Sequence, residues 1–281
     1  MSLPYFLGCP SWSEPAWRGS LFAKGLSSQA FLPAYSQVFN CVEGNTTFYA
    51  KPSAETVSRW AAQVPDDFHF CAKFYRQVSH SNDLREQIGA ALEFIELLKP
   101  LLAKGAPMWL QLPASFGPWR LPELETFVKA MAVPMAVEVR HLAFFMKGEE
   151  ERALNRLLLE QGVERICLDS RALFSCQEQS AAVLHAQAKK PRLPLRPAAF
   201  SQSPQVRFIG HPELAANDEF LAPWVEKVAQ WIEAGLTPHV FLHTPDNHQA
   251  PELALRFHAQ LCTRLPGLAA REFTATQLGL F

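Results

Sequence analysis

Charged side chains stand at the ends of short apolar runs along this 281-residue chain. Three carboxylates, Glu43, Glu138 and Asp169, could transfer protons as general acids or bases. Lys73 could stabilise negative charge that develops beside them. Carboxylates that lie close to cationic groups have shifted pKa values, which acid–base catalysis requires. These four residues are therefore the candidate catalytic groups.

Other polar and aromatic residues near the same run ends could bind a ligand. Arginine has a forked guanidinium group that suits a carboxylate or a phosphate. With only 13 glycines the chain has no glycine-rich phosphate loop, so side chains would have to hold an anion. Aromatic rings could wall the pocket for a sugar or a base. The candidate ligand-binding residues are Arg140, Arg207, Asn45, Gln111, His243, Trp12 and Tyr49.

A purely structural role for the same residues remains open. A charge enclosed by a folded core has to be paired or neutralised, so some of these residues could simply satisfy one another. The aromatic residues could equally close one end of the core. The convergence of many polar groups nevertheless favours a concave functional site that binds an anion.

Histidines near the run ends raise the question of a metal site. They are His80, His141, His211 and His243. The sequence lacks an HExxH motif and a tight HxH or HxD pair, and neighbouring arginines and lysines would compete for the carboxylates. GxSxG, GxGxxG and P-loop motifs are also missing from the sequence. We expect neither a metal nor a cofactor.

Eight short apolar runs alternate with longer amphipathic stretches. Parallel strands that helices cover on both faces are apolar throughout, and this spacing is typical of a single-domain α/β protein with a TIM-like (β/α)8 barrel. An open doubly wound sheet is the alternative. Ser53 is the expected N-cap of one helix, and Gly235 is expected to end another. The predicted strands span residues 4–9, 39–45, 68–74, 107–113, 135–140, 165–170, 206–211 and 239–244.

The overall charge argues against a protein that binds polyanions over its whole surface. The chain has 26 basic and 27 acidic residues, a net charge of -1, and 48% hydrophobic residues. Any anion site must therefore be local. One basic, proline-rich stretch, residues 189–204, is predicted to be a solvated connector, although its lysines and arginines could face phosphates. No run approaches the length of a membrane span, so we expect a cytoplasmic protein without membrane contact.

Seven sequence blocks resemble the YecE-like family, the domain of unknown function 72. They include VEGNTTFY, WLQLPASFG, VEVRH, LDSR and RFIGH, and they follow one another in the order and approximate spacing of the family. The resemblance implies a TIM-like barrel over residues 1–265, and it implies no established reaction. It places the family's polar positions on Glu43, Asn45, Lys73, Gln111, Glu138, Arg140, Asp169 and Arg207.

The chain departs from the family pattern at the last strand. Many relatives carry two asparagines where this chain has His243 and Thr244, which puts a shared role for that corner in doubt. The fold is also similar to that of endonuclease IV and xylose isomerase relatives, but their metal ligands do not map onto this chain. Analogy of fold alone gives no chemistry.

Three functions are therefore compatible with the sequence. The first is an enzyme that acts on an anionic or phosphorylated ligand derived from a sugar or a nucleic acid. The second is a non-catalytic module that binds such a ligand or a nucleic-acid fragment. The third is a metal-dependent hydrolase or isomerase. The sequence does not predict the oligomeric state.

The chain ends on QLGLF, after a polar connector, within a tail predicted at residues 266–281. The pentapeptide resembles the motif that binds the bacterial DNA sliding clamp. In that interpretation Gln277 would form hydrogen bonds, and Leu278, Leu280 and Phe281 would enter an apolar pocket of the clamp. The alternative is that these apolar residues pack against the barrel.

Overall fold

The computed structural model describes residues 3–272. Its strands are β1 (Phe6–Cys9), β2 (Cys41–Gly44), β3 (His69–Ala72), β4 (Met108–Gln111), β5 (Met135–Glu138), β6 (Glu164–Arg165), β7 (Cys167–Asp169), β8 (Gln205–Ile209) and β9 (His239–His243). Its α-helices are α1 (Phe31–Ser36), α2 (Thr46–Tyr49), α3 (Ala54–Gln63), α4 (Arg76–Ser79), α5 (Ile88–Leu102), α6 (Leu121–Ala130), α7 (Glu149–Glu160), α8 (Arg171–Ser175), α9 (Ala181–Lys189), α10 (Asp218–Glu233) and α11 (Ala250–Arg264).

All eight predicted apolar runs contain strands, and the sixth is divided into β6 and β7 on either side of Ile166. The strands pair in parallel within two sheets, in the orders β3-β2-β1-β9-β8-β7 and β4-β5-β6. One bridge, between Lys73 and Trp109, links β3 to β4. The parallel α/β class is confirmed, whereas the predicted single closed barrel is not seen as one continuous sheet.

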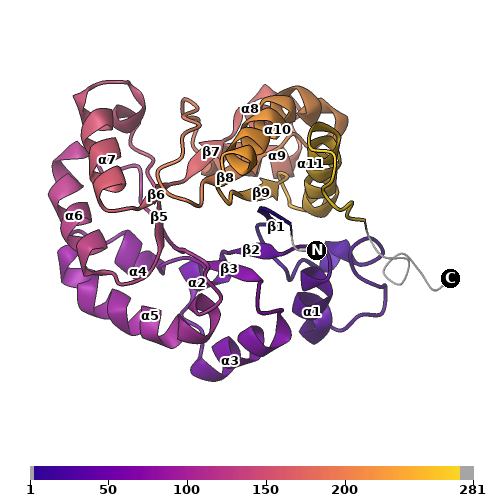
Figure 1. Cartoon of the computed structure of the whole chain (residues 1–281), viewed down its shortest axis with the longest axis horizontal. Helices are drawn as coiled ribbons and strands as arrows, with labels where there is room; N and C mark the ends of the chain where they lie inside the picture. The colour runs from indigo at the N-terminus through magenta and orange to yellow at the C-terminus, as the bar shows by residue number, and fades with distance from the viewer. Residues whose placement is uncertain (1–2, 273–281) are drawn as a thin grey trace.

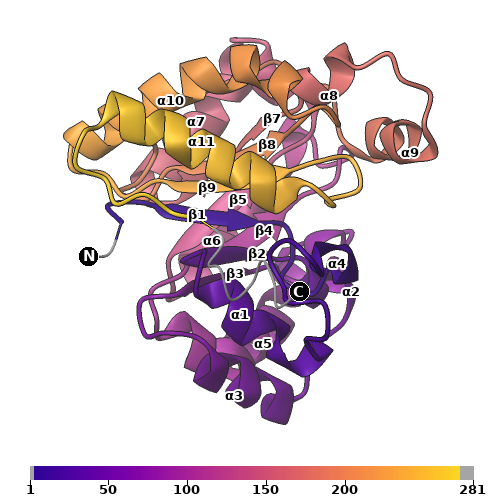
Figure 2. The same cartoon turned by 90° about the vertical axis from the view of Figure 1, so that its right-hand side faces the viewer.

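Helices cover the strands from outside. In Figures 1 and 2, α10 and α11 lie on one side of the strands, and α3 and α5 lie on the other. The strands are accordingly buried on both faces, as the apolar runs predicted: β2, β4, β5, β8 and β9 are buried along their whole lengths. The polar groups that these strands carry must therefore find partners inside the protein.

Local sequence signals set several helix ends. The Ser53 side chain accepts a hydrogen bond from the amide of Thr56 and caps α3, as predicted. Gly235 follows α10 with φ +78°, a left-handed conformation that glycine adopts without strain. The end of β2 also requires glycine, because a Cβ on Gly44 would lie 2.6 Å from the Phe70 ring. Gly44 thereby lets β2 and β3 approach closely directly beside Glu43.

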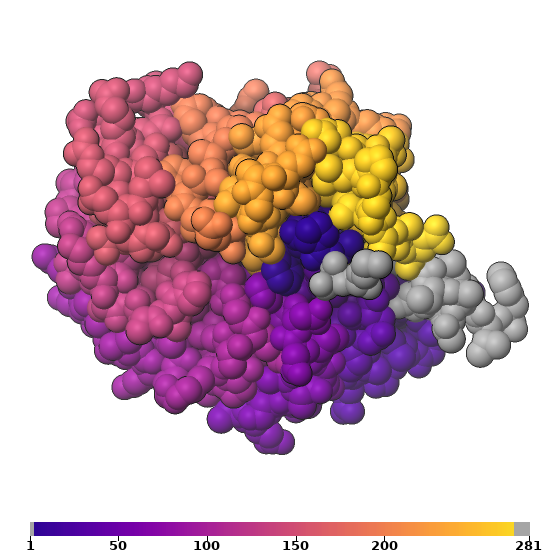
Figure 3. Space-filling model, viewed as in Figure 1, coloured from indigo at the N-terminus to yellow at the C-terminus, as the bar shows by residue number. Residues whose placement is uncertain are grey.

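The first strand and the last helix lie side by side. β1 pairs with β9, and Tyr5 Oη lies 2.7 Å from Nδ1 of His258 on α11. Figure 3 shows the indigo N-terminal segment next to the yellow end of the described chain.

No helix within residues 3–272 is long and apolar enough to cross a membrane. The QLGLF segment lies outside the described residues.

Candidate anion-binding site

Glu43, on β2, is the centre of a buried group of charges. Its Oε1 accepts hydrogen bonds from Lys73 Nζ at 2.7 Å and from Arg207 Nη2 at 2.6 Å. Its Oε2 accepts from Arg207 Nε at 3.0 Å and lies 2.8 Å from Nε2 of His243. All four side chains are at most 2% exposed. One carboxylate thus holds Lys73, directly after β3, Arg207, in the middle of β8, and His243, at the end of β9.

Glu138, the last residue of β5, completes the group. Its Oε1 lies 2.7 Å from both Nε and Nη2 of Arg140, and its Oε2 accepts a hydrogen bond from Arg207 Nη1. Lys73 also donates to Gln111 Oε1 at 3.1 Å. Arg207 therefore joins the two carboxylates. We call this set the ion network: Glu43, Lys73, Glu138, Arg140, Arg207 and His243.

The backbone around Lys73 is fixed by a single hydroxyl group. Thr47 Oγ1 accepts from Lys73 N at 2.8 Å and lies 2.8 Å from Lys73 O and 2.9 Å from Gly44 O. The Lys73 ammonium lies 5.0 Å from the centre of the Trp109 ring, which gives it a cation–π contact. The lysine is consequently held both at its backbone and at its charged end.

The two carboxylates of the network are ionised at neutral pH. Burial alone would raise the pKa of Glu43, but Arg207, Lys73 and His243 outweigh it and hold that pKa well below its usual value. Burial likewise opposes ionisation of Glu138, and Arg207 and Arg140 lower its pKa nonetheless. Opposite charge at short range therefore prevails over desolvation at both sites.

Two nitrogen groups of the network have lowered pKa values. Burial and the nearby Arg207 lower the pKa of Lys73 to about 8, although Glu43 and Glu138 act in the opposite direction. Burial lowers the pKa of His243 to about 3 despite the attraction of Glu43. His243 is therefore neutral at pH 7, and its Nε2 carries the proton that it donates to Glu43.

A cationic pocket lies over the ion network. It has a volume of about 440 Å³, and five arginines and lysines but no carboxylate line it. Arg140 and Arg207 are held by the carboxylates below. Arg76, Lys189 and Lys190 form no ion pair with any described residue in the range 3–272. We call this the rim pocket; its lining residues are Asn45, Phe48, Tyr49, Arg76, His80, Gln111, Arg140, Lys189, Lys190 and Arg207.

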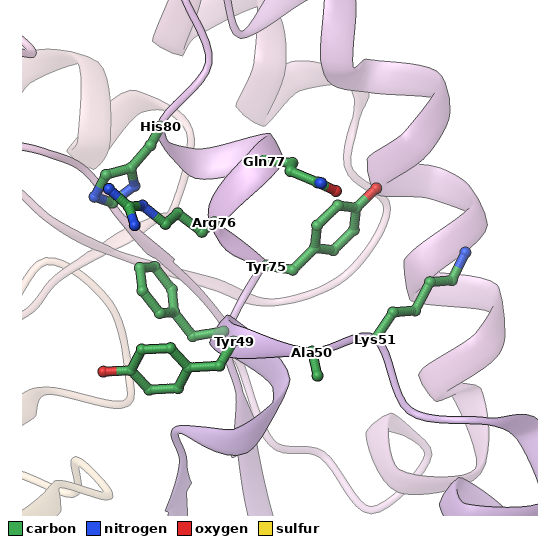
Figure 4. Close-up of a pocket in the computed structure, with 8 residues that line it drawn as sticks. Tyr49, Ala50, Lys51, Tyr75, Arg76, Gln77 and His80 are labelled. Atoms are coloured by element: carbon green, nitrogen blue, oxygen red, sulfur yellow. The ribbon is translucent and has the colours of Figure 1, made fainter.

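Two further pockets adjoin the rim pocket through shared residues. One, of about 640 Å³, shares Phe48, Tyr49, Arg76 and His80 with it, and Figure 4 shows Arg76 and His80 from the α4 region on the same side as the Tyr49 ring. The other, of about 310 Å³, we call the side pocket. Its lining residues are Pro10, Ser11, Trp12, Asn45, Thr46, Tyr49, Lys190, His243 and Asn247.

All seven predicted ligand-binding residues line the rim pocket or the side pocket. Tyr49 is 78% exposed and lines all three pockets. Asn45 lines two of them and donates through Nδ2 to Pro10 O at 2.8 Å. Trp12 is only 6% exposed and packs edge-on against Trp60. Tyr49 thus offers a free aromatic face, whereas Trp12 is largely part of the core.

The structure does not bring Asp169 into the ion network. Asp169 accepts hydrogen bonds from Arg171 and, at 2.8 Å, from Trp224 Nε1 on α10. On β7 it lies opposite Phe208 rather than opposite Arg207. Its side chain therefore faces the helix layer, and its interactions are those of a residue that joins β7 to α8 and α10.

The predicted binding residues leave out three cations of the rim pocket: Arg76, and the two lysines Lys189 and Lys190, which the sequence indicated only as possible phosphate contacts of a solvated connector. The predicted connector at 189–204 begins with the last residue of α9 and is irregular after it, and its first two lysines line the pocket. Its Arg196 instead pairs with Glu151 at 2.9 Å. Arg76 follows the third strand closely, and this position after a strand is the feature of the sequence that could have indicated it.

Within residues 3–272 no group of three or more His, Cys, Asp or Glu side chains has the arrangement of a metal site.

These features define a parallel α/β protein with a buried ion network beneath a cationic pocket at the carboxyl ends of its strands. The chain belongs to the DUF72 family, because the model described as "Protein of unknown function DUF72" matches residues 6–277. It is 42% identical over 278 residues to the UPF0759 protein YecE of Escherichia coli strain K12, covering 98% of this chain and 99% of the relative. The UPF0759 protein YunF of Bacillus subtilis strain 168 is 27% identical over 175 residues, 58% of this chain and 60% of the relative.

Two solved structures of DUF72 family proteins share the fold. That of Thermotoga maritima MSB8 superimposes with a TM-score of 0.68 and 21% identity, over 92% of this chain and 98% of the other. That of Enterococcus faecalis V583 gives a TM-score of 0.69 and 20% identity, over 98% of this chain and all of the other. At this level of identity the similarity is one of fold.

Proposed function

We propose that the chain is an enzyme that binds a phosphorylated small molecule or a nucleic-acid fragment in the rim pocket. The observation that carries this proposal is the charge of the lining: five arginines and lysines surround about 440 Å³ without a lining carboxylate. Like charges gathered in a cavity repel one another, and an anion with several oxygens relieves that repulsion.

Cations that carboxylates hold in place and cations without such a partner would have different roles in binding an anion. Glu43 and Glu138 hold the guanidinium group of Arg207 from below, so that its position is set before a ligand arrives. Arg76 and Lys189 have no such partner among residues 3–272 and are exposed, which leaves their charges available to a phosphate. A preoriented arginine with exposed cations beside it suits a multivalent oxyanion.

An enzymatic role draws support from one pKa value beneath the pocket. Lys73, with a pKa of about 8, can exchange a proton near neutral pH, whereas His243, with a pKa of about 3, stays neutral there. The carboxylates predicted as catalytic, Glu43 and Glu138, already accept hydrogen bonds from cations at both oxygens. Their geometry favours the positioning of Arg207 and Lys73, and general-base catalysis by either one stays a prediction.

We also propose that the two sheets work as one barrel. The Lys73–Trp109 bridge lies between β3 and β4, and the hydrogen bond from Phe74 N to Trp109 O, at 2.9 Å, reinforces it. On the other side, β6 and β7 follow one another in the chain around Ile166. Protection of the Phe74 amide from hydrogen exchange, equal to that of β2 amides, would support closure, and rapid exchange there would contradict it.

Binding can be tested by titration calorimetry with ribose 5-phosphate and adenosine monophosphate, against ribose and adenosine. We expect heat only with the phosphorylated members of each pair, and at least a tenfold loss of affinity in an Arg76→Ala, Lys189→Ala double variant. Lys99→Ala, in the last turn of α5 and 70% exposed, is the matched control and should bind as the parent does. Equal binding by the double variant would contradict the proposal.

Turnover needs a separate measurement. Each ligand that binds is incubated with excess protein and recovered, and its mass and anomeric form are compared with those of the starting material. A changed product that requires an intact rim pocket supports an enzyme. Quantitative return of the unchanged ligand would favour the non-catalytic binding module.

Recruitment to the DNA sliding clamp is a second, independent proposal that rests on the sequence QLGLF alone. A peptide ending in these residues should bind a purified bacterial clamp with a dissociation constant in the micromolar range, about 8 kcal/mol of binding free energy. Exchanging Leu280 and Phe281 for alanine should abolish binding. No binding by the parent peptide would end this proposal.

A further inference from the structure

Lys190 is the one residue besides Tyr49 and Asn45 that lines both the rim pocket and the side pocket. It is half-buried, and it forms no ion pair with any residue of the described range 3–272. The charged groups that face it are Arg207, Glu43, Lys73 and Glu138 of the ion network, and it also influences His243. An amine in this position can reach a ligand in either cavity.

We propose that Lys190 is a nucleophile that forms a covalent imine with the carbonyl carbon of a phosphorylated aldehyde or ketone. The inference rests on the proposed function, because the rim cations would hold the phosphate while the carbonyl group lies towards the side pocket. A lysine that is partly buried beside other cations is a recurrent way to obtain a neutral, reactive amine.

The environment of Lys190 fits this role. Burial, and after it the charge of Arg207, lower the pKa of Lys190 to about 7, while Glu43 has the opposite effect. About half of the Lys190 side chains would then carry a free electron pair at neutral pH. An exposed lysine with an ordinary pKa near 10.4 would be almost wholly protonated. Lys190 should therefore react far faster than the surface lysines.

The chemistry balances without an oxidant or a reductant. The Lys190 Nζ electron pair forms a bond to the carbonyl carbon, the carbonyl oxygen takes a proton, and the attacking nitrogen loses one. The resulting carbinolamine then loses water as the C=N bond forms. His243 lines the side pocket together with Lys190, and its Nδ1 accepts no hydrogen bond from any residue within 3–272. With a pKa of about 3 the ring carries no proton at Nδ1 near neutral pH, so Nδ1 can accept a hydrogen bond from the carbinolamine hydroxyl group, while solvent water carries the proton from the attacking nitrogen to the departing hydroxyl group.

The test is reductive trapping with glyceraldehyde 3-phosphate and sodium cyanoborohydride, followed by peptide mapping. We expect one equivalent of adduct on Lys190, formed at least ten times faster than on Lys189, with a rate that rises through pH 7 and levels off above it. Lys190→Arg keeps the positive charge and should remove this adduct. The wild-type mapping needs no variant, so a Lys190→Arg protein that fails to fold leaves the test intact.

Unphosphorylated glyceraldehyde separates the two proposals. If Lys190 is labelled preferentially by glyceraldehyde but the phosphate gives no advantage, the lysine inference stands and the anion site is wrong. If ribose 5-phosphate binds in calorimetry but label spreads evenly over exposed lysines, the anion site stands and the imine proposal is overturned. The Arg76→Ala, Lys189→Ala variant should slow labelling by glyceraldehyde 3-phosphate alone.

Discussion

The ion network and the rim pocket both contain arginines and lysines, but they differ in whether carboxylates pair with those cations. In the network every cation has a carboxylate partner, and Glu43 and Glu138 each serve more than one. In the rim pocket Arg76, Lys189 and Lys190 have no carboxylate partner among residues 3–272. The cations of the network are therefore neutralised without a ligand, whereas these three cations of the rim pocket are not.

This difference separates charges that stabilise the fold from charges that can bind a ligand. A buried charge is tolerated because partners replace the water that it has lost, and removing one partner leaves the other charge uncompensated. An exposed cation without a partner keeps its water, and it costs the fold little until an anion arrives. Substitutions in the network should therefore act on stability, and substitutions in the rim should act on binding.

The largest effect is expected from Glu43→Ala. The change removes the acceptor of Lys73, Arg207 and His243 at once, and leaves two buried cations with fewer partners. Loss of one partner of a buried ion pair costs about 3–5 kcal/mol, and we expect a decrease of that size in the free energy of unfolding in urea.

Glu96→Ala provides the control for Glu43→Ala. Glu96 pairs with Lys99 on the surface of α5 and is 71% exposed. Its removal should change the unfolding free energy by no more than about 0.5 kcal/mol. Equal stability of the two variants would break the distinction between network and rim.

A smaller effect, dependent on pH, is expected from His243→Asn. The pKa of His243 is about 3 in the folded protein against 6.5 for an ordinary histidine. Above pH 6.5 the ring is neutral in both states and contributes no pH dependence. Between pH 6.5 and 3 the unfolded chain takes up a proton that the folded chain refuses, so stability falls as the pH falls.

Asparagine keeps an N–H donor for Glu43 and has no titrating ring. The variant should therefore lose less stability between pH 6.5 and 5 than the parent, by at most about 1.4 kcal/mol per pH unit. Thermal unfolding across this range measures the difference, and above pH 6.5 the two profiles should run parallel. Identical slopes below pH 6.5 would show that His243 titrates normally.

The sequence predicted the strands well because parallel strands covered on both faces are apolar throughout, and the eight runs could be found without knowledge of their neighbours. The ends of those runs also pointed to Glu43, Lys73 and Arg207, which the structure brings into contact. A run end gives the position of a residue along a strand but not the face that it occupies. Asp169 illustrates this limit, since the register of β7 and β8 turns it towards Trp224.

Lys189 and Lys190 illustrate a second limit. Lys189 is the last residue of α9 and Lys190 is its C-cap, directly before an irregular, proline-rich segment, and no local periodicity tells where such a chain end crosses the fold. Only the path of the chain between α9 and β8 places them over Arg207. The sequence also did not show that the strands would be divided between two sheets, because β6 and β7 belong to one apolar run and only Ile166 separates them.

Tyr49→Ala tests whether a residue of the rim pocket acts on ligand binding through its aromatic ring. The ring is 78% exposed and lines all three pockets, so it can lie against a base without loss of core packing. Affinity for adenosine monophosphate should fall by about 0.5–1.5 kcal/mol, the value of a good aromatic contact. Affinity for ribose 5-phosphate should stay the same. Equal losses for both ligands would show that Tyr49 acts on the shape of the pocket and not through its ring.

The smallest expected change in the free energy of unfolding tests whether the cations of the rim pocket contribute to the stability of the fold. The Arg76→Ala, Lys189→Ala double variant removes two cations that line the pocket together with Lys190, Arg140 and Arg207. No carboxylate within residues 3–272 loses a partner by this change, and some repulsion is relieved, so the unfolding free energy should stay within about 0.5 kcal/mol of the parent. Any gain should appear at low ionic strength and fade as salt screens the remaining charges. Thermal melts at two salt concentrations, without ligand, measure this. A large loss of stability would mean that the rim cations hold the fold together, and the unpaired charges could then no longer be assigned to a ligand.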